Sequence, residues 1–528
     1  MNPVLLASVS PYVVGSFVGY LVLMLAIGAL FSGKMKNLGD YYLGGRKMNK
    51  WVVALSAQAS DMSGWLLMGL PGAVFVSGFS EAWIGIGLGI GTYLNWKIVA
   101  HRLRQYSKAC GDSITIPDFI CNRFRDKTGA SRMVAAVIIL AFFLFYTASG
   151  FVSAAKLFNT MFGMEYQTAL WIGAAVVVSY TLLGGYMAVC WTDFIQGSLM
   201  FAAIVIVPSC VVAAAGGFSA TVDQINAVSA PGVHGQYLLN LFTSASTGEA
   251  MGIIGLVSCL AWGLGYFGMP HILVRFMSID NPAEVKGSRR IAMAWVFISL
   301  GAAVVIGLVG HLFLAQHPGV TLDDPEKVFM VMINTIFNNG ALSKLFAGIL
   351  LSAIMAAIMS TADSQLLVSA SAFTNDLYKK VLHKNASNRE LVQVSRLAVA
   401  AVAVIAAIMA SNTQSEFFKV VMKTVSFAWG GFGAAFGPLI LLALFWRRTN
   451  LAGAVSGMVV GAATCFLWKF WLAPTYGAAH PIFGVYELAP GFLLSLVTII
   501  VVSLLTKKPS KEMLDEFDRV NALPEANG

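Results

Sequence analysis

Four polar side chains interrupt a long apolar run, LLSAIMAAIMSTADSQLLVSA, that is otherwise typical of a membrane helix. Ser360, Thr361, Asp363 and Ser364 fall within five positions, and residues four apart share one face of a helix. The carbonyl of Ala357 lies one turn before Thr361. Hydroxyl and carbonyl oxygens are the ligands that a hard cation prefers, so the run predicts a site for a monovalent ion. Hydroxyls that only bond back to carbonyls one turn earlier are the alternative.

Two other apolar runs carry signs of a broken helix. The first, SAQASDMSGWLLMGLPGAVF, places Asp61 near Ser63 and Gly64. The second, VSCLAWGLGYFGMPHIL, has three glycines within the seven residues before Pro270. Irregular backbone in hydrocarbon is tolerated where it lines a cavity or is buried in protein, and an acid within a membrane span is costly and typically functional. Glycines that merely permit close helix packing are the alternative.

The composition identifies the environment of these runs. Of the 528 residues, 58% are hydrophobic and 11% are charged, and the mean hydropathy is +0.75. A soluble globular protein carries roughly 25% charged residues, so this chain must expose apolar surface to lipid. The composition excludes a soluble enzyme, a nucleic-acid-binding protein and a disordered scaffold, and it predicts an all-α multi-pass membrane protein.

A bilayer core needs roughly 20 apolar residues per helix, and this criterion predicts about thirteen spans. We expect one membrane transport domain over residues 1–506 and a short cytoplasmic tail over 507–528. The predicted spans lie near residues 11–31, 51–78, 80–100, 131–161, 166–187, 192–217, 249–275, 291–316, 344–375, 394–412, 425–446, 451–473 and 487–506.

The loops predict the orientation of the chain. With the N-terminus outside, 28 of the 34 Lys and Arg residues fall on the cytoplasmic side, including four in the stretch from Arg275 to Arg290. Cytoplasmic loops are enriched in these residues. We therefore expect the N-terminus outside and the C-terminus in the cytoplasm, and we interpret the net charge of +9 as a topology signal.

The two broken runs lie five spans apart, in corresponding positions of two sets of five spans. Because five is odd, the second set must insert upside down relative to the first. This arrangement is typical of transporters with inverted repeats, whose interrupted helices hold substrate and ion near the membrane midplane. We expect the repeats at about residues 51–217 and 249–446.

At the same residues the chain resembles the sodium:solute symporter family, and within it the bacterial members that transport proline. The resemblance extends from about residue 36 to 470. It implies a five-plus-five inverted-repeat (LeuT-like) core and sodium-coupled import of L-proline across the bacterial cytoplasmic (inner) membrane, and no enzymatic activity. The motifs that carry it are DYYLGGR (40–46), SDMSGWLLMGLPGAVF (60–75), WGLGYFGMPHIL (262–273), STADSQLL (360–367) and AWGGFGAAFGP (428–438).

The resemblance also implies roles for individual residues. Asp61 matches the acid that the family needs for sodium coupling. The main sodium site would use the carbonyls of Ala59, Met62 and Ala357 and the hydroxyls of Ser360 and Thr361. The proline pocket would use Ser63, Gly64, Trp65, Tyr146, Trp262, Tyr266 and Pro270. A possible second sodium would use Asp193, Asp363 and Ser364, together with Ser360.

Two of these assignments have alternatives. Asp363 stands where some proline carriers are expected to have a hydroxyl, so it is either part of the second sodium site or a structural acid paired with a cation. Arg46 is a candidate for an inner-gate ion pair with Asp40 or Asp193, or one more positive-inside anchor.

Charge in the broken runs restricts the substrate independently of the family. Residues 51–96 and 249–274 contain no Lys or Arg, so a net anion would lack a fixed cation there, whereas a zwitterion can use helix-end amides and unwound carbonyls. L-proline fits, as do betaine and other small neutral amino acids. Another zwitterion or a monocarboxylate is the alternative substrate within the family. We expect sodium as coupling ion, no cofactor, no nucleic acid and no obligate protein partner.

Overall fold

The computed structural model describes residues 10–32, 38–182, 185–228 and 234–523 and is almost entirely helical. This described part contains two isolated β-bridges and no β-strand. Within the described ranges, eight uninterrupted helices are long enough to cross the apolar core of a bilayer. They are α1 (Pro11–Ser32), α8 (Ala130–Phe162), α10 (Tyr186–Ala214), α14 (Val285–Gln316), α16 (Gly340–Ser371), α17 (Asn388–Ala410), α19 (Val421–Phe445) and α22 (Leu488–Leu505).

Further spans are assembled from shorter helices joined end to end. The two predicted interruptions are confirmed: one falls at the end of α3, and the other bends the chain by 43° between the Trp262–Phe267 turn and α13. The pieces are α3 (Lys50–Gly64), η3 (Trp65–Gly69) and α4 (Leu70–Ser77); α5 (Ala82–Leu94), η5 (Asn95–Val99) and α6 (Ala100–Ala109); α12 (Ile253–Ala261), η7 (Trp262–Phe267) and α13 (Pro270–Ser278); and α20 (Leu451–Leu467), η11 (Trp468–Leu472) and α21 (Ala473–Tyr476).

Short helices make up most of the remaining structure. They are α2 (Leu38–Leu43), η2 (Gly44–Arg46), α7 (Ile116–Arg123), α9 (Tyr166–Thr181), α11 (Phe218–Ala227), η9 (Pro325–Lys327), α15 (Val328–Ile336), η10 (Ala372–Leu382), α18 (Glu416–Lys419) and α23 (Lys511–Asn521).

The expected count of thirteen spans is not confirmed. In the described ranges, ten helical runs are long and apolar enough to cross a membrane, or eleven when the bent pair is included. Two segments account for the lower number of spans. Residues 50–109 form one continuous run across a turn at Gly78, where φ is +77°, and α9 has only 16 residues.

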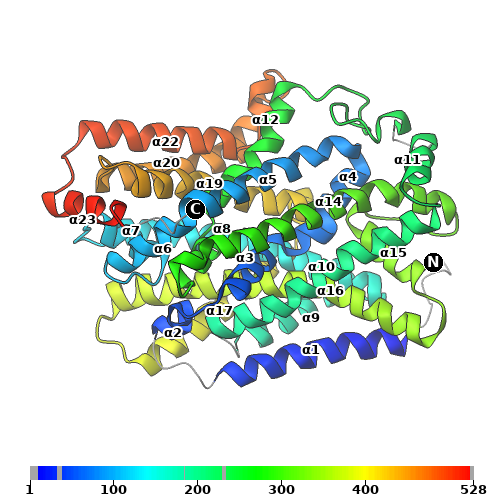
Figure 1. Cartoon of the computed structure of the whole chain (residues 1–528), viewed down its shortest axis with the longest axis horizontal. Coiled ribbons are helices and arrows are strands. Elements are labelled where there is room, and N and C mark those ends of the chain that lie inside the picture. The colour runs from blue at the N-terminus through cyan, green and yellow to red at the C-terminus, as the bar shows by residue number, and fades with distance from the viewer. Residues whose placement is uncertain (1–9, 33–37, 183–184, 229–233, 524–528) are drawn as a thin grey trace.

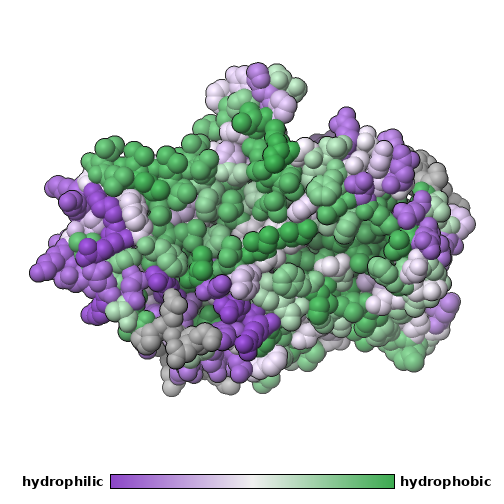
Figure 2. All heavy atoms as spheres, turned by 45° about the horizontal axis from the view of Figure 1, so that its top comes forward, coloured by the Kyte–Doolittle hydropathy of each residue, from purple (hydrophilic) through white to green (hydrophobic). Residues whose placement is uncertain are grey.

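The arrangement of apolar surface agrees with a membrane protein. The helices run roughly side by side along the long axis in Figure 1, and Figure 2 shows an apolar band between two hydrophilic ends. In the middle of the bundle, α16 packs against α1, α3, α8 and α10, while α19 packs against α8, α20, α22 and η7. The chain is therefore an all-α multi-pass membrane protein in which α16 and α19, the most buried of the long spans, pack against the interrupted helices.

Backbone contact between α5 and η7 fixes the position of the second interruption. A Cβ atom on Gly263 would lie far inside van der Waals contact of the Gly87 carbonyl, and one on Gly91 would collide with Gly263.

Overpacking of this kind costs about 1–3 kcal/mol, so Gly263→Ala is expected to lower the free energy of unfolding by that amount. Thermal unfolding in detergent measures it. Gly301→Ala is the control, because its Cβ would meet no atom within 4 Å; equal melting of the two variants would contradict the prediction.

The expected tail after residue 506 contains a docked helix that the sequence analysis did not identify. Met513, Phe517 and Val520 are buried and lie on one face of α23, which contacts α6. Glu516 pairs with Arg125 at 2.8 Å. The spacing of these three apolar residues is the signal that could have predicted the helix.

Candidate functional site

The first interruption is built at Ser63, at the end of α3. Ser63 has φ 39° and ψ −168°, a conformation that costs energy for any residue other than glycine. Its hydroxyl accepts a hydrogen bond from the Trp65 amide at 3.1 Å, and the Met62 carbonyl accepts the same amide proton. The buried serine thus supplies one acceptor for the backbone N–H that the irregular turn leaves outside the regular helical pattern.

The oxygens assigned to the main sodium site lie together between α3 and α16. Ser360 donates to the Ala59 carbonyl at 2.8 Å and to the Ala357 carbonyl at 3.2 Å. Thr361 donates to the same Ala59 carbonyl at 3.3 Å. All four residues are buried. Two hydroxyls and two carbonyls from two helices therefore meet at one point, whereas the Met62 carbonyl faces the Trp65 amide.

Asp61 connects this cluster to a small cavity. Its carboxylate accepts a hydrogen bond from the Tyr266 hydroxyl at 2.5 Å, and its carbonyl accepts one from the Tyr146 hydroxyl at 3.1 Å. One acidic residue thus joins the break in α3 to η7 and to α8. The cavity that these side chains surround is lined by Asp61, Met62, Trp65, Leu88, Tyr146, Trp262, Tyr266, Val425 and Trp429.

Four of the seven residues assigned to the proline pocket line this cavity, namely Trp65, Tyr146, Trp262 and Tyr266. The other three lie elsewhere. Ser63 and Gly64 form the turn, with Gly64 packed against Ser153, and Pro270 lines a different hollow next to Tyr186 and Arg275.

Sequence reasoning assigned no role to Trp429, which donates from its ring nitrogen to the Trp262 carbonyl at 2.7 Å. The motif AWGGFG, which contains Trp429, was the available signal.

Two aromatic rings of the cavity, Trp65 and Trp262, continue into a ladder with a third ring behind them, Tyr486. The Trp65 and Trp262 ring centroids are 5.6 Å apart, and those of Trp262 and Tyr486 are 5.3 Å apart. Tyr486 precedes α22, and its hydroxyl donates to the Ser426 carbonyl of α19 at 2.5 Å. Three segments that are distant in sequence therefore form this ladder.

Tyr486 is expected to position Trp262 over the substrate. Tyr486→Ala removes the ring contact, worth about 0.5–1.5 kcal/mol in addition to buried area, so we expect the KM for substrate to rise about 3- to 10-fold with a smaller change in kcat. Tyr486→Phe keeps the ring and should restore the KM. Initial rates of uptake measure both values. If both variants raise the KM equally, the hydrogen bond from the hydroxyl to Ser426 positions Trp262, and the contact between the rings does not.

Arg275 is the main correction to the sequence analysis, which placed it in a cytoplasmic loop. It lies within α13 and is 1% exposed. Its guanidinium pairs with Asp193 of α10 at 3.1 Å and donates to Ser364 of α16 at 2.5 Å and to Ser56 of α3 at 3.2 Å. The loop assignment is wrong because the helix continues to Ser278, one turn beyond the predicted end of the span.

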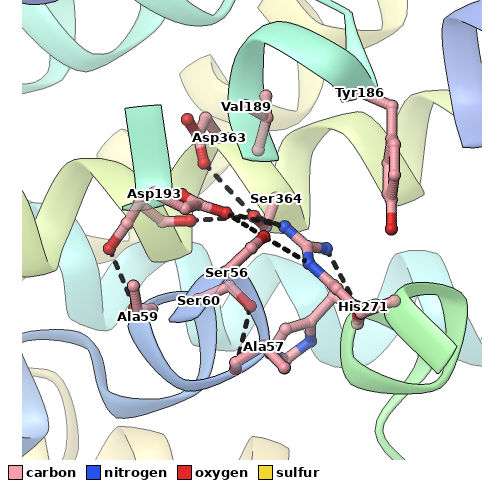
Figure 3. Close-up of polar contacts among 12 residues, drawn as sticks. Ser56, Ala57, Ala59, Ser60, Tyr186, Val189, Asp193, His271, Asp363 and Ser364 are labelled. Carbon is pink, nitrogen blue, oxygen red and sulfur yellow. Dashed lines mark hydrogen bonds and ion pairs between the residues drawn. The ribbon is translucent and has the colours of Figure 1, made fainter. Parts of the chain in front are cut away.

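The residues assigned to a second sodium surround this guanidinium. Figure 3 shows Asp193, Asp363 and Ser364 gathered beside Ser56. Asp363 is fully buried on α16, where the Ser364 hydroxyl lies 3.3 Å from its carboxylate. Among the described residues, one carboxylate oxygen of Asp193 and one of Asp363 have no hydrogen-bond partner. Asp193 thus pairs directly with Arg275, whereas Asp363 is linked to the guanidinium through the Ser364 hydroxyl.

Arg46, the last residue of η2, links η2 to α13 and to the loop that follows α6. It pairs with Asp112 at 2.9 Å and donates to the Met277 carbonyl at 2.6 Å and to the Ser113 carbonyl at 2.7 Å. Burial lowers the pKa of its guanidinium, and the Asp112 carboxylate opposes that shift. The structure pairs Arg46 with Asp112 and not with Asp193, while the side chain of Asp40 lies outside the described residues.

Glu326 of η9 connects α8 to α19 at the opposite end of the bundle. Glu326 pairs with Lys156 at 2.5 Å and accepts from the Val421 and Met422 amides at 3.1 Å, so it caps the N-terminus of α19. Met422 also accepts from the Trp65 ring nitrogen at 2.8 Å. Sequence reasoning missed Glu326, because its partners lie about 95 and 170 residues away along the chain.

Comparisons with known proteins find relatives along nearly the whole chain. The chain is 47% identical to the high-affinity proline transporter PutP of Bacillus subtilis, over 94% of this chain and 98% of the relative. It is 44% identical to the sodium/proline symporter of Escherichia coli, over 96% of each. A solved substrate-bound, outward-open structure of a Na⁺-coupled sialic acid symporter matches 96% of this chain and 100% of its own with a TM-score of 0.76, at 18% identity.

A family model locates the likeness along the chain. The model described as the sodium:solute symporter family matches residues 41–461, which include both interruptions, the oxygen cluster and the aromatic cavity. The match covers well over half of the chain and agrees with the relatives that are more than 40% identical to it. The chain therefore belongs to the sodium:solute symporter family.

Proposed function

We propose that this chain imports L-proline together with sodium and works by alternating access. The observation that carries the proposal is that the ion site and the cavity meet within three consecutive residues, from Ala59 to Asp61. The carbonyl of Ala59 faces the Ser360 and Thr361 hydroxyls, while Asp61 contacts the tyrosines that wall the cavity. Sodium that orders this turn would also order the cavity. Each ligand would then raise the affinity for the other.

The composition of the cavity favours a zwitterion with an apolar body. Its described lining residues include four aromatic side chains besides Trp429, one carboxylate and no Lys or Arg. The Asp61 carboxylate can receive an ammonium group, and the aromatic rings can pack against a pyrrolidine ring. The names of the two relatives support proline among the zwitterions. Betaine, another neutral amino acid or a monocarboxylate is the alternative.

A single sodium supplies enough energy for such a transporter. One charge that crosses 100 mV yields about 2.3 kcal/mol, and a tenfold sodium gradient adds about 1.4 kcal/mol. The sum of about 3.7 kcal/mol permits roughly 500-fold accumulation at one sodium per substrate. A second cation near Asp193, Asp363 and Ser364 would share its carboxylates with Arg275, so we expect it to bind more weakly than sodium at the main site.

The orientation follows from the charge distribution. We propose that the N-terminus is outside and the C-terminus in the cytoplasm of a bacterial inner membrane. The inverted repeats at about 51–217 and 249–446 would then place α3 and α12–α13 in opposite directions across the bilayer, within a single transport domain. Arg46 would close the cytoplasmic approach and Glu326 the outer one.

Uptake of labelled L-proline into proteoliposomes tests the proposal. We expect accumulation with an inward sodium gradient, none with potassium, and its loss in Asp61→Ala. The control variant is Asp223→Ala, an exposed acid of α11. Accumulation of betaine or lactate instead of proline would contradict the substrate, whereas accumulation that ignores sodium would contradict the coupling ion.

A further inference from the structure

An apolar groove runs along the lipid-facing side of the bundle between α5 and α14, which lie side by side (Figure 1). Three glycines, Gly85, Gly89 and Gly301, line the groove, and a Cβ atom on Gly301 would meet no atom within 4 Å. The walls include Ile86, Ile90 and Leu94 of α5 and Phe297, Val304 and Leu308 of α14.

A basic pocket lies beyond one end of this groove. Its described lining residues include Lys97 of η5, His101 and Arg102 of α6, and Lys286 and Arg289 of α14, and none of them is acidic. Lys97, Lys286 and Arg289 take part in none of the ion pairs that the structure shows among its described residues. The charge rule for loops puts this pocket on the cytoplasmic side.

Tyr93 connects the groove to the pocket. It lines the groove and is 39% exposed. The Lys97 ammonium lies 5.5 Å from the centroid of its ring, and the Arg289 guanidinium lies 5.8 Å away. The apolar walls therefore lead directly to two cations, one from each of the two helices.

The dimensions match one acyl chain. From Ala82 to Leu94, α5 rises about 18 Å at 1.5 Å per residue, which is slightly more than half of a hydrocarbon core of about 30 Å. An acyl chain of one leaflet would fill the groove, and the phosphate of the same molecule would then reach the level of Lys97 and Arg289. Basic pockets at the cytoplasmic ends of membrane helices are suited to anionic head groups.

We propose that the groove and the basic pocket together form a binding site for an anionic phospholipid. One acyl chain lies between α5 and α14, and Lys97, Lys286 and Arg289 hold the phosphate. A zwitterionic lipid can place its chain in the same groove, but its choline group would meet the same cations unfavourably. The site therefore selects lipids by the charge of the head group.

Native mass spectrometry of the purified full-length chain tests this site with phosphatidylglycerol and phosphatidylcholine of identical acyl chains. We expect phosphatidylglycerol to bind about 30-fold more tightly, which corresponds to about 2 kcal/mol from two cations. The double variant Lys97→Gln/Arg289→Gln should reduce this preference to less than 3-fold. The control Lys507→Gln/Lys508→Gln removes two exposed cations after α22 and should keep it.

A second pair of variants tests the groove. Gly301→Leu places a side chain in the groove at a position where a Cβ would meet no atom within 4 Å, and Gly15→Leu is the matched control on α1, where a Cβ would also meet none. We expect Gly301→Leu to weaken both lipids and Gly15→Leu to weaken neither. Equal binding of the two lipids to the unmodified chain, or a preference that survives Lys97→Gln/Arg289→Gln, would overturn the proposal. The outcome is independent of whether proline is the substrate.

Discussion

Replacing Arg275 with methionine is expected to lower the free energy of unfolding by about 3–5 kcal/mol. The guanidinium is 1% exposed and pairs with Asp193, which is fully buried. Removal of one partner of a buried ion pair leaves an uncompensated charge in a medium of low dielectric. Ser364 lies between Arg275 and the Asp363 carboxylate, so Arg275→Met would also remove a positive charge close to this second buried acid. Thermal unfolding in detergent measures the loss.

A double-variant cycle separates lost charge from lost packing. Asp193→Asn/Arg275→Met removes the pair as a whole and is expected to recover at least half of the stability lost by Arg275→Met alone. Arg447→Met is the matched control, because its ion pair with Asp518 is more than half exposed on both sides and should contribute 1 kcal/mol or less. If the double variant melts no higher than Arg275→Met, charge compensation is not what this arginine provides.

Thr361→Ala is expected to raise the sodium concentration needed for half-maximal uptake by about 10- to 100-fold. The hydroxyl lies 3.3 Å from the Ala59 carbonyl, within the oxygen cluster of α3 and α16. The loss of one oxygen partner of a charged group costs about 1.5–3 kcal/mol. The variant keeps the other three oxygens, so we expect the maximal rate at saturating sodium to change less than the sodium dependence does.

Ser352→Ala is the matched control for this variant. Ser352 is buried on α16, about two turns before the cluster, and its hydroxyl bonds back to the Gly348 carbonyl at 2.7 Å. Its removal should leave the sodium dependence unchanged. A similar shift in both variants would mean that any polar residue of α16 tunes transport, and Thr361 would lose its assignment as an ion ligand.

Local features of the sequence were sufficient to predict both helix interruptions and the hydroxyls of α16, whereas the Ala59 carbonyl of α3 was implied by the family resemblance. The glycines and the acid near Ser63 lie within a few residues of the break that they cause, and hydroxyls at Ser360 and Thr361 stand out in an apolar helix. Periodicity and composition also identified the fold class, because the bilayer imposes a length and a hydrophobicity on every span. The number of spans was harder to predict, because the run that contains α9 is apolar but its helix has only 16 residues, fewer than a span needs.

Pairings between distant segments could not be predicted. The positive-inside rule counted Arg275 among loop residues, because the sequence does not show that Asp193, 82 residues away, lies opposite it. Arg46 meets Asp112 for a similar reason, and Tyr486 joins the aromatic ladder from a segment that precedes α22. These contacts depend on how helices pack in three dimensions, and a single sequence gives no measure of that packing.

Equilibrium binding of labelled L-proline to the purified protein, measured across a range of sodium concentrations, tests the central claim most directly. If sodium at the Ala59, Ala357, Ser360 and Thr361 oxygens orders the cavity, sodium must raise the affinity for proline, and proline must raise the affinity for sodium by the same factor. We predict a factor of at least 10 in both directions, reduced in Thr361→Ala and retained in Ser352→Ala. Proline affinity that is the same with and without sodium would contradict the account.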